Sequence, residues 1–409
     1  MKILHISTMS KGGAFLAVSR LNDALNSHCV DSRILVLENP DVSSEAIPYI
    51  KHSNSFIYRL FYKIKKSVLY RLKIGIGKYW RIHDTLRRNE PCIYSFPIST
   101  FRVEKHQLVK NWADIIHLHW CNNFINYPTF FASITKPIVW TFHDISFKYG
   151  GFHFERDFIH HHHTYFDLEN TLYKIKEESL YSKTNITLLA LSEEIKHEIE
   201  STPYLSNKKI VLLPNIINFD DYIILNKYEC RKKLNLTNNK VILFVSENVD
   251  TESKGLNDLK KALDEIDEYD IALCIVGNYI KKDKDHKFNS FYTGKISDNK
   301  VLNQYYSAAD LLVIPSHQES FALTAFESMA SGTPVVSYPC GATTNYINDI
   351  NGIICETKDP NELKKCILKA LVIKYDAQLI RDQIVNRLNP KKIVEDYVFL
   401  YNELTKPQN

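Results

Sequence analysis

Residues 307–338 have the sequence SAADLLVIPSHQESFALTAFESMASGTPVVSY, and this stretch decides the fold. The apolar run at residues 311–314 predicts a buried parallel strand, which Pro315 ends. Residues 322–330 have the spacing of a helix, and a second buried strand begins at residues 335–336. A strand, loop, helix, strand unit predicts an open α/β sheet, whose ligands bind at the carboxyl ends of the strands.

Two carboxylates mark this unit. Glu319 lies in the predicted loop and Glu327 in the predicted helix, with seven residues between them. A carboxylate can accept two hydrogen bonds from a vicinal diol, so Glu327 predicts a ribose or hexose ligand. Glu319 approaches a helix N-terminus, where free amides favour a phosphate. The alternative is that both are solvated surface acids, as most glutamates are.

The run that begins at Glu319, ESFALTAFESMASGTPVV, resembles the signature of the retaining glycosyltransferases of family 4, which have the GT-B fold. The resemblance implies two Rossmann-like domains that face each other across a cleft, with a C-terminal helix that crosses back to the first domain. It also implies that Glu327 binds the nucleotide ribose and that Glu319 contacts the transferred sugar. The backbone of Phe321, Ala322 and Leu323 would then contact the sugar and the diphosphate.

The length of 409 residues predicts two domains rather than one core. We expect an acceptor-binding domain at residues 1–203 and a sugar-nucleotide-binding domain at residues 204–388. The polar segment 201–209 is the predicted linker, and residues 389–409 are the helix that returns to the first domain.

The composition is that of a soluble globular protein, with 44% hydrophobic and 24% charged residues. A net charge of +4 does not argue for nucleic acid. The eight cysteines are scattered and form no CxxC pair, which indicates buried free thiols and a reducing compartment. Neither a signal peptide nor a spanning run of about 20 apolar residues is visible, so we expect a cytoplasmic protein.

A pair of glycines follows the first predicted strand, at residues 2–7. Gly12 and Gly13 precede a predicted helix at residues 14–26. Glycines between a strand and a helix let backbone amides approach an anion, although most such pairs are only turns. In the family that the chain resembles, this loop meets the donor diphosphate or the acceptor.

Residues 57–88 have a different composition, with ten Lys or Arg and one acid. Apolar side chains recur among them at roughly helical spacing. A basic amphipathic helix can bind an anionic membrane surface, here the inner face of the plasma membrane. The alternative is a helix that packs its apolar stripe on its own domain.

Histidines follow two predicted buried strands. His117 and His119 lie near the end of the run 112–120, and we expect them to point to opposite faces. His143 and Asp144 follow the strand at residues 138–142. A lone core histidine is usually structural, but two parallel strands that each deliver a histidine at one edge favour a site.

The resemblance implies a role for these side chains. His119 is the candidate for the histidine near the anomeric carbon, with His117 as the reserve. His143 and Asp144 are candidates for positioning the acceptor hydroxyl.

Two further segments could suggest metals. His160 to His163 are four adjacent histidines, and we expect a solvated loop there because they cannot all ligate one ion from a regular element. Asp283 and Asp285 form a DxD among lysines, away from a strand end, and we attribute it to chance. An aromatic, glycine-hinged stretch at residues 147–158 predicts an acceptor-side loop.

The second half contains three more donor-site candidates. Asn215 lies in a segment that resembles the family pattern PNGID, with Ile216 in place of the glycine. Lys254 matches the Lys-Gly of the family, but the Arg expected earlier in that loop is absent, so Lys254 would contact the diphosphate alone or with another cation. Gly277 ends a predicted strand at residues 271–276.

The sequence therefore predicts a metal-independent, retaining glycosyltransferase with no cofactor. Its donor would be a hexose linked to UDP or GDP, and its acceptor a glycan or lipid-linked chain of a cell-surface polysaccharide such as capsule or lipopolysaccharide. No nucleic acid partner is expected. The alternatives are a GT-B chain without activity, acting as a subunit or membrane adaptor, and a sugar-nucleotide epimerase.

Overall fold

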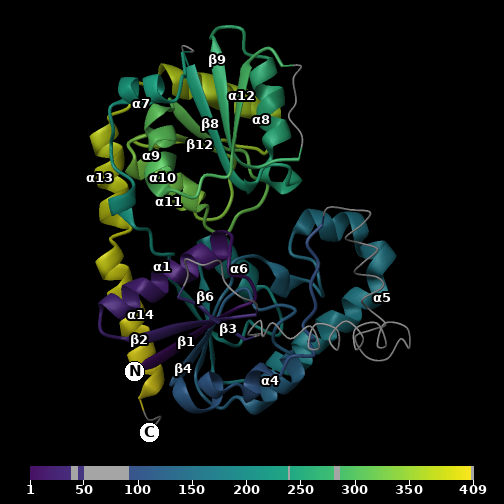
Figure 1. Cartoon of the computed structure of the whole chain (residues 1–409). Helices are drawn as coiled ribbons and strands as arrows, with labels where there is room; N and C mark the ends of the chain where they lie inside the picture. The colour runs from purple at the N-terminus through teal and green to yellow at the C-terminus, as the bar shows by residue number, and fades with distance from the viewer. Residues whose placement is uncertain (38–44, 50–91, 238–239, 281–285, 407–409) are drawn as a thin grey trace, which may run out of the picture. The chain divides into compact units, whose positions relative to one another are not determined.

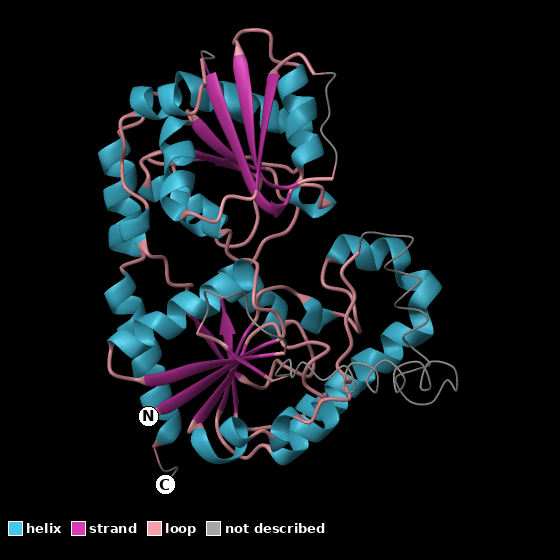
Figure 2. Cartoon of the chain, in the orientation of Figure 1, coloured by secondary structure: helices cyan, strands magenta, loops and turns pink. Residues whose placement is uncertain are grey.

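The computed structural model describes residues 1–37, 45–49, 92–237, 240–280 and 286–406. The chain forms two compact units, each built on its own parallel sheet with helices around it (Figures 1 and 2). The first unit contains residues 1–191, 195–213 and 394–409, and the second contains residues 192–194 and 214–393.

The first unit has a seven-stranded sheet with the order β3-β2-β1-β4-β5-β6-β7. Its strands are β1 (Lys2–Ser7), β2 (Asp31–Val36), β3 (Ile47–Pro48), β4 (Ile115–Leu118), β5 (Ile138–Thr141), β6 (Ile186–Ala190) and β7 (Lys209–Leu212). Every neighbouring pair is parallel. β4 and β5 are wholly buried and mostly apolar, as expected of strands that are covered on both faces.

Helices connect these strands. They are α1 (Gly13–Ser27), α4 (Tyr127–Ser133), α5 (Glu155–Leu180) and α6 (Glu193–Glu200), with the short turns η1 (Val103–Lys105), η2 (Leu108–Trp112) and η3 (Ser146–Lys148). The last helix of the chain, α14 (Pro390–Thr405), runs beside this sheet, since residues 394–409 belong to the first unit (Figure 1). The C-terminal helix thus returns to the first domain, as predicted.

The second unit has a six-stranded parallel sheet with the order β10-β9-β8-β11-β12-β13. Its strands are β8 (Lys240–Asn248), β9 (Ile271–Asn278), β10 (Asn289–Gly294), β11 (Leu311–Ile314), β12 (Val335–Ser337) and β13 (Gly352–Ile354). Its helices are α7 (Lys227–Lys233), α8 (Leu256–Asp264), α9 (Asn299–Ala308), α10 (Leu323–Ala330), α11 (Thr343–Tyr346), α12 (Pro360–Val372) and α13 (Ala377–Arg387), with the turns η4 (Phe219–Asp221) and η5 (Glu252–Lys254). The strand, loop, helix, strand unit predicted from residues 307–338 is present as β11, α10 and β12.

Two predictions about the first unit are wrong. Residues 201–209 are not the boundary, because β7 continues the first sheet by pairing with β6, and the division of the chain falls after Leu213. The predicted end of the first domain at residue 203 is therefore about ten residues too early. His160 to His163 are not in a loop either, because they belong to α5, which begins at Glu155.

Some predictions fall outside the described residues. The basic segment 57–88 lies among residues 50–91, and Asp283 and Asp285 lie among residues 281–285. Within the described part of the chain, no helix is both long and apolar enough to cross a bilayer.

Candidate functional site

The second sheet has its switch point between β8 and β11. From β8 the chain proceeds outward to β9 and β10, and from β11 it proceeds the other way to β12 and β13. The loops that leave two such strands diverge at their carboxyl ends, which is where open α/β sheets bind ligands. Lys254 follows β8 and Glu319 follows β11, so both candidates lie at this point.

Lys254 and Glu319 form an ion pair. The Nζ atom of Lys254 donates to Oε1 of Glu319 at 2.6 Å, and the hydroxyl of Ser316 donates to the same oxygen at 3.1 Å. The two side chains are 29% and 17% exposed, so water still reaches them. A cation and a carboxylate thus lie side by side, the first suited to a phosphate and the second to hydroxyl groups.

The backbone around Lys254 requires a glycine at the next position. Gly255 has φ +72°, and a Cβ atom there would lie 1.8 Å from the carbonyl oxygen of Pro315. The loop after β8 is therefore packed directly on the loop after β11. The amide of His317 also donates to the carbonyl of Ser253 at 2.9 Å, which joins the two loops a second time.

Glu327 lies on α10 and is only 3% exposed. The hydroxyl of Tyr306, on α9, donates to its Oε2 atom at 3.0 Å. The sequence interpretation placed this carboxylate within outward reach of a hydroxyl pair, whereas the structure shows it inside the unit. A bound diol would therefore have to approach closely or move this side chain.

The residues between the two glutamates begin α10. Ala322 has φ +60°, a left-handed conformation that is uncommon for a residue with a Cβ atom, and Leu323 is the first helical residue. Phe321 is buried and its ring packs on Phe326, with the ring centroids 4.6 Å apart. Non-glycine residues in this conformation are concentrated at functional sites.

Two other predicted donor-site residues, Gly277 and Asn215, lie in positions that packing explains. At Gly277, which has φ +142°, a Cβ atom would lie 1.8 Å from the carbonyl oxygen of Ser246, so this glycine permits the close approach of β9 to β8. Asn215 is buried and lies two positions after Leu213, where the chain leaves the first unit for the second.

The first sheet has its switch point between β1 and β4. Gly12 and Gly13 follow β1, and Gly12 has φ +86° directly before α1. A Cβ atom at either glycine would meet nothing within 4 Å among the described residues, so this loop is open where the phosphate-loop prediction requires space.

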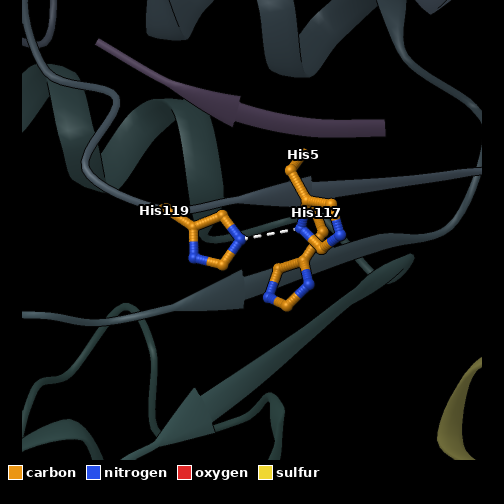
Figure 3. Close-up of side chains that lie close together, drawn as sticks. All are labelled: His5, His117 and His119. Atoms are coloured by element: carbon orange, nitrogen blue, oxygen red, sulfur yellow. Dashed lines mark hydrogen bonds between the residues drawn. The ribbon is translucent and has the colours of Figure 1, made fainter. Parts of the chain in front are cut away.

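Four histidines gather at the same point. His5 comes from β1, His117 from β4, His119 follows β4 and His143 follows β5 (Figure 3 shows the first three). The prediction that His117 and His119 point to opposite faces is wrong, because their rings stack with centroids 4.1 Å apart. Residues i and i+2 of a strand share a face, and only successive residues alternate. His5 was not among the predicted site residues.

Burial keeps these histidines neutral. It lowers the pKa of His5 to about 3 and that of His143 to about 4, although Asp144 raises the latter in part. Burial, together with the neighbouring rings, also holds the pKa values of His117 and His119 well below the ordinary 6.5. A neutral imidazole has one N–H donor and one acceptor nitrogen, so each ring of the cluster can donate one hydrogen bond and accept another.

His117 is the most enclosed member. Its Nδ1 atom lies 2.7 Å from the hydroxyl of Tyr401, on α14, and its Nε2 atom lies 2.7 Å from the hydroxyl of Thr141. The ring is 0% exposed. His117 therefore joins the C-terminal helix to the sheet, and this arrangement favours a structural role over acceptor binding.

Asp144 belongs to a second network. Its Oδ2 atom accepts from Nδ1 of His153 at 2.6 Å and from the indole N–H of Trp120 at 2.9 Å. The Nε2 atom of His153 lies 2.6 Å from the hydroxyl of Ser95. Burial tends to raise the pKa of Asp144, but the charge and hydrogen bond of His153 and the hydrogen bonds from Ser146 outweigh it and hold that pKa well below its ordinary value. His153 and Ser95 were missed because no local pattern marks them.

Helix α5 fixes the segment that follows Asp144. The buried carboxylate of Glu169 accepts from the amides of Gly150 and Gly151 at 2.9 and 2.8 Å. Lys176, also buried, donates to the carbonyls of Ser146 and Tyr149, both at 2.7 Å, and burial lowers its pKa to about 8. This part of the predicted acceptor loop 147–158 is therefore a clamped segment, and several of its aromatic rings lie in the core.

Comparison with known proteins adds to this geometry. Residues 239–372, about a third of the chain, match the model of a family described as glycosyl transferases group 1. The second unit resembles a group 1 glycosyl transferase. The ion pair of Lys254 and Glu319 and the carboxylate of Glu327 all lie inside the matched residues.

Two curated relatives are similar over parts of the chain. A D-inositol 3-phosphate glycosyltransferase of Geodermatophilus obscurus is 40% identical over 73 residues, which are 18% of this chain and 16% of that protein. An uncharacterised glycosyltransferase of Methanocaldococcus jannaschii is 27% identical over 273 residues, which are 61% of this chain and 64% of that protein. The chain thus aligns with less than two thirds of the length of either relative.

The similarity in fold covers more of the chain than the similarity in sequence does. The solved structure of Anabaena HepE in complex with UDP-glucose superposes with a TM-score of 0.64 and 15% identity, over 98% of this chain and 100% of that chain. At that identity the likeness concerns the fold alone. Together with the two parallel-sheet units, it confirms the predicted GT-B class.

Proposed function

We propose that this protein is a retaining glycosyltransferase, which transfers a hexose from a UDP- or GDP-linked donor to a glycan or lipid-linked acceptor in cell-surface polysaccharide synthesis. The observation that carries the proposal is the ion pair of Lys254 and Glu319 at the switch point of the second sheet. It lies within the residues that match group 1 glycosyl transferases. The UDP-glucose bound by the Anabaena protein supports a nucleotide-sugar donor.

In this proposal, the second unit holds the donor. Lys254 exchanges Glu319 for the diphosphate, which releases the carboxylate of Glu319 to bind hydroxyls of the transferred sugar. Glu327 binds the ribose. The backbone around Ala322 contacts the sugar and the diphosphate, and its left-handed conformation aims those amides.

The first unit supplies the acceptor side. Its candidate residues are His119 and His143, whose rings are hydrogen-bonded to each other, and Asp144 holds the segment after His143 through His153. The open loop at Gly12 and Gly13 offers amides to an anionic group of either substrate.

We assign no step to a metal ion. The leaving diphosphate gains its stabilisation from Lys254 and from loop amides, which are fixed before the reaction and therefore need no reorganisation when charge develops.

A membrane surface is the proposed location of a lipid-linked acceptor. The proposal rests on the ten cations of residues 57–88, each worth about 1 kcal/mol near an anionic surface. Vesicles of phosphatidylglycerol at low salt should therefore bind the protein, and phosphatidylcholine vesicles should not. If the protein binds both kinds of vesicle equally, the membrane proposal fails and the acceptor is a soluble glycan.

The test of the proposed function uses the full chain and a set of labelled nucleotide sugars. Binding is followed by thermal shift, and the products are followed by chromatography, so that transfer, epimerisation and mere binding are distinguished. Lys254→Ala should weaken donor binding about 10-fold, as expected for the loss of a hydrogen bond between charged groups.

The matched control is Lys364→Ala, which removes the partner of Glu265 at the far end of α8. This variant should bind the donor like the wild type. If no nucleotide sugar binds, or if Lys254→Ala binds as tightly as the control, the donor site has been assigned to the wrong residues.

A further inference from the structure

Three of the four clustered histidines form a hydrogen-bonded row across adjacent strands. Nδ1 of His5 lies 2.9 Å from Nε2 of His119, and Nδ1 of His119 lies 3.1 Å from Nε2 of His143 (Figure 3 shows the first link). His5 lies on β1, and the other two follow β4 and β5. The row therefore runs from the interior of the sheet to the edge where the candidate acceptor site lies.

Metal binding is the first function to consider for this cluster. Nitrogen atoms of His5, His117 and His119 all lie within 4.8 Å of one another, a set that resembles a zinc site. Their hydrogen bonds argue against it. His5 and His119 already share a hydrogen bond through Nδ1 and Nε2, and both nitrogens of His117 are bonded to hydroxyl groups.

The row constrains where the protons lie. His5 and His119 are buried and His143 is partly buried, and the lowered pKa of each ring keeps it neutral, so each ring carries one proton on one nitrogen. If His5 donates from Nδ1, then Nε2 of His119 must accept and its proton is on Nδ1. That proton is donated to Nε2 of His143, whose own proton is then also on Nδ1. In the opposite direction, all three protons lie on Nε2.

The two ends of the row decide between these directions. At the inner end, Nε2 of His5 is buried and has no hydrogen-bond partner among the described residues. A proton there would make an orphaned buried N–H group, which native structures avoid. At the outer end, the negative Asp144 stabilises positive charge on His143. The charge of Asp144 therefore favours the arrangement with the protons on Nδ1, in which each N–H group points from His5 toward His143.

We infer that His5 is a positioning residue that fixes the protons of His119 and His143 on their Nδ1 atoms. Both ring nitrogens of His119 are then used inside the row. In this tautomer Nδ1 of His143 carries a proton, so it can donate to a hydroxyl or phosphoryl oxygen but cannot abstract a proton. Only this last role rests on the proposed function, since the proton positions follow from the row itself.

The test is the tautomeric state of the rings, measured by long-range ¹H–¹⁵N correlation on the full chain with ¹⁵N-labelled histidine at about pH 7.5. Single variants of His5, His119 and His143 to Asn assign the three rings among the sixteen histidines. All three should carry the proton on Nδ1, whereas free histidine in water prefers Nε2. A proton on Nε2 of His119 or His143 in the wild type would overturn the inference.

An isosteric pair of variants tests the role of His5 itself. His5→Asn keeps a donor near the Nδ1 position and should leave Nε2 of His119 without a proton. His5→Asp offers only an acceptor there when its carboxylate is ionised, which the ¹³C shift of the labelled carboxyl carbon reports, so Nε2 of His119 must then gain a proton, as the reversed tautomer or as imidazolium. An unprotonated Nε2 in the folded His5→Asp variant would show that His5 does not set the row.

This measurement is separate from activity. If the tautomers agree and no sugar is transferred, the proposed function fails and the inference stands. If sugar is transferred by a protein whose His143 carries its proton on Nε2, the inference fails and the function stands.

Discussion

The buried histidines make the first unit sensitive to acid, and His5 allows this effect to be measured. Its ring is 0% exposed, and burial lowers its pKa from 6.5 to about 3. In the unfolded chain the ring has its ordinary pKa, so below pH 6.5 the unfolded state binds a proton that the folded state does not bind. The free energy of unfolding therefore falls as the pH falls from about 6.5 toward 3.

The magnitude follows from the linkage relation. Each pH unit between the two pKa values costs about 1.4 kcal/mol per proton, so acidification to about pH 5 costs about 2 kcal/mol for His5. His143 also lowers the free energy of unfolding as the pH falls, since its pKa is lowered to about 4. The wild type should thus lose at least about 2 kcal/mol between about pH 7.5 and 5. His5→Asn keeps a donor toward His119 but does not titrate, so it should lose about 2 kcal/mol less.

Tryptophan fluorescence can measure this loss in the first unit alone. None of the four tryptophans, at positions 80, 112, 120 and 140, belongs to the second unit, which consists of residues 192–194 and 214–393. Urea unfolding followed by this signal avoids mixing the two units, which need not unfold together. The control is His28→Gln, which removes an exposed histidine and should keep the pH dependence of the wild type. If His5→Asn loses as much stability as the wild type, His5 is not a buried neutral group and the argument fails.

Three further predictions concern the second unit and the chemistry. Glu327→Ala should raise the dissociation constant of the nucleotide sugar about 10- to 150-fold in isothermal titration calorimetry, because a hydrogen bond to a charged group contributes about 1.5 to 3 kcal/mol. Unchanged affinity in a folded variant would remove Glu327 from the site. Transferase activity should survive excess EDTA in a radiolabel assay, and a loss that Mg²⁺ or Mn²⁺ restores would refute the metal-independent mechanism. Gly255→Ala should destabilise the second unit by more than 1 kcal/mol in thermal unfolding, because its Cβ atom would meet the carbonyl of Pro315 and the residue has positive φ. Gly13→Ala, where space is open, should not destabilise its own unit, and equal effects of the two would contradict the packing argument.

Local sequence patterns predicted the strands and helices around the candidate site well. The apolar runs that became β1, β5 and β11 are short, continuous and followed by glycine, proline or polar residues, as in buried parallel strands. The boundary between the units was predicted less well. β7 follows a polar segment and is itself only partly buried, so nothing in its sequence showed that it belongs to the first sheet.

The side-chain partners could not be predicted, because they depend on which strands become neighbours. His5 and His119 are 114 residues apart and meet only because β1 pairs with β4. Ser95 and His153 are 58 residues apart and lie outside any strand. Tyr306 reaches Glu327 from a different helix, which places that carboxylate inside the unit rather than on its surface. The shared face of His117 and His119, by contrast, is predictable from the sequence, because residues two positions apart in a strand project to the same side.

The two switch points use opposite electrostatics, and this difference has a consequence for binding. In the second unit, Lys254 and Glu319 are charged and partly open to water, so a ligand phosphate must replace a carboxylate that already neutralises the lysine. Charges of this kind are screened, and donor affinity should weaken as salt is added. In the first unit, the histidines are neutral and held by hydrogen bonds, so salt should leave their arrangement unchanged while acid disrupts it. Salt and pH therefore act on different units, and titrating one at a fixed value of the other separates the contribution of the second unit from that of the first.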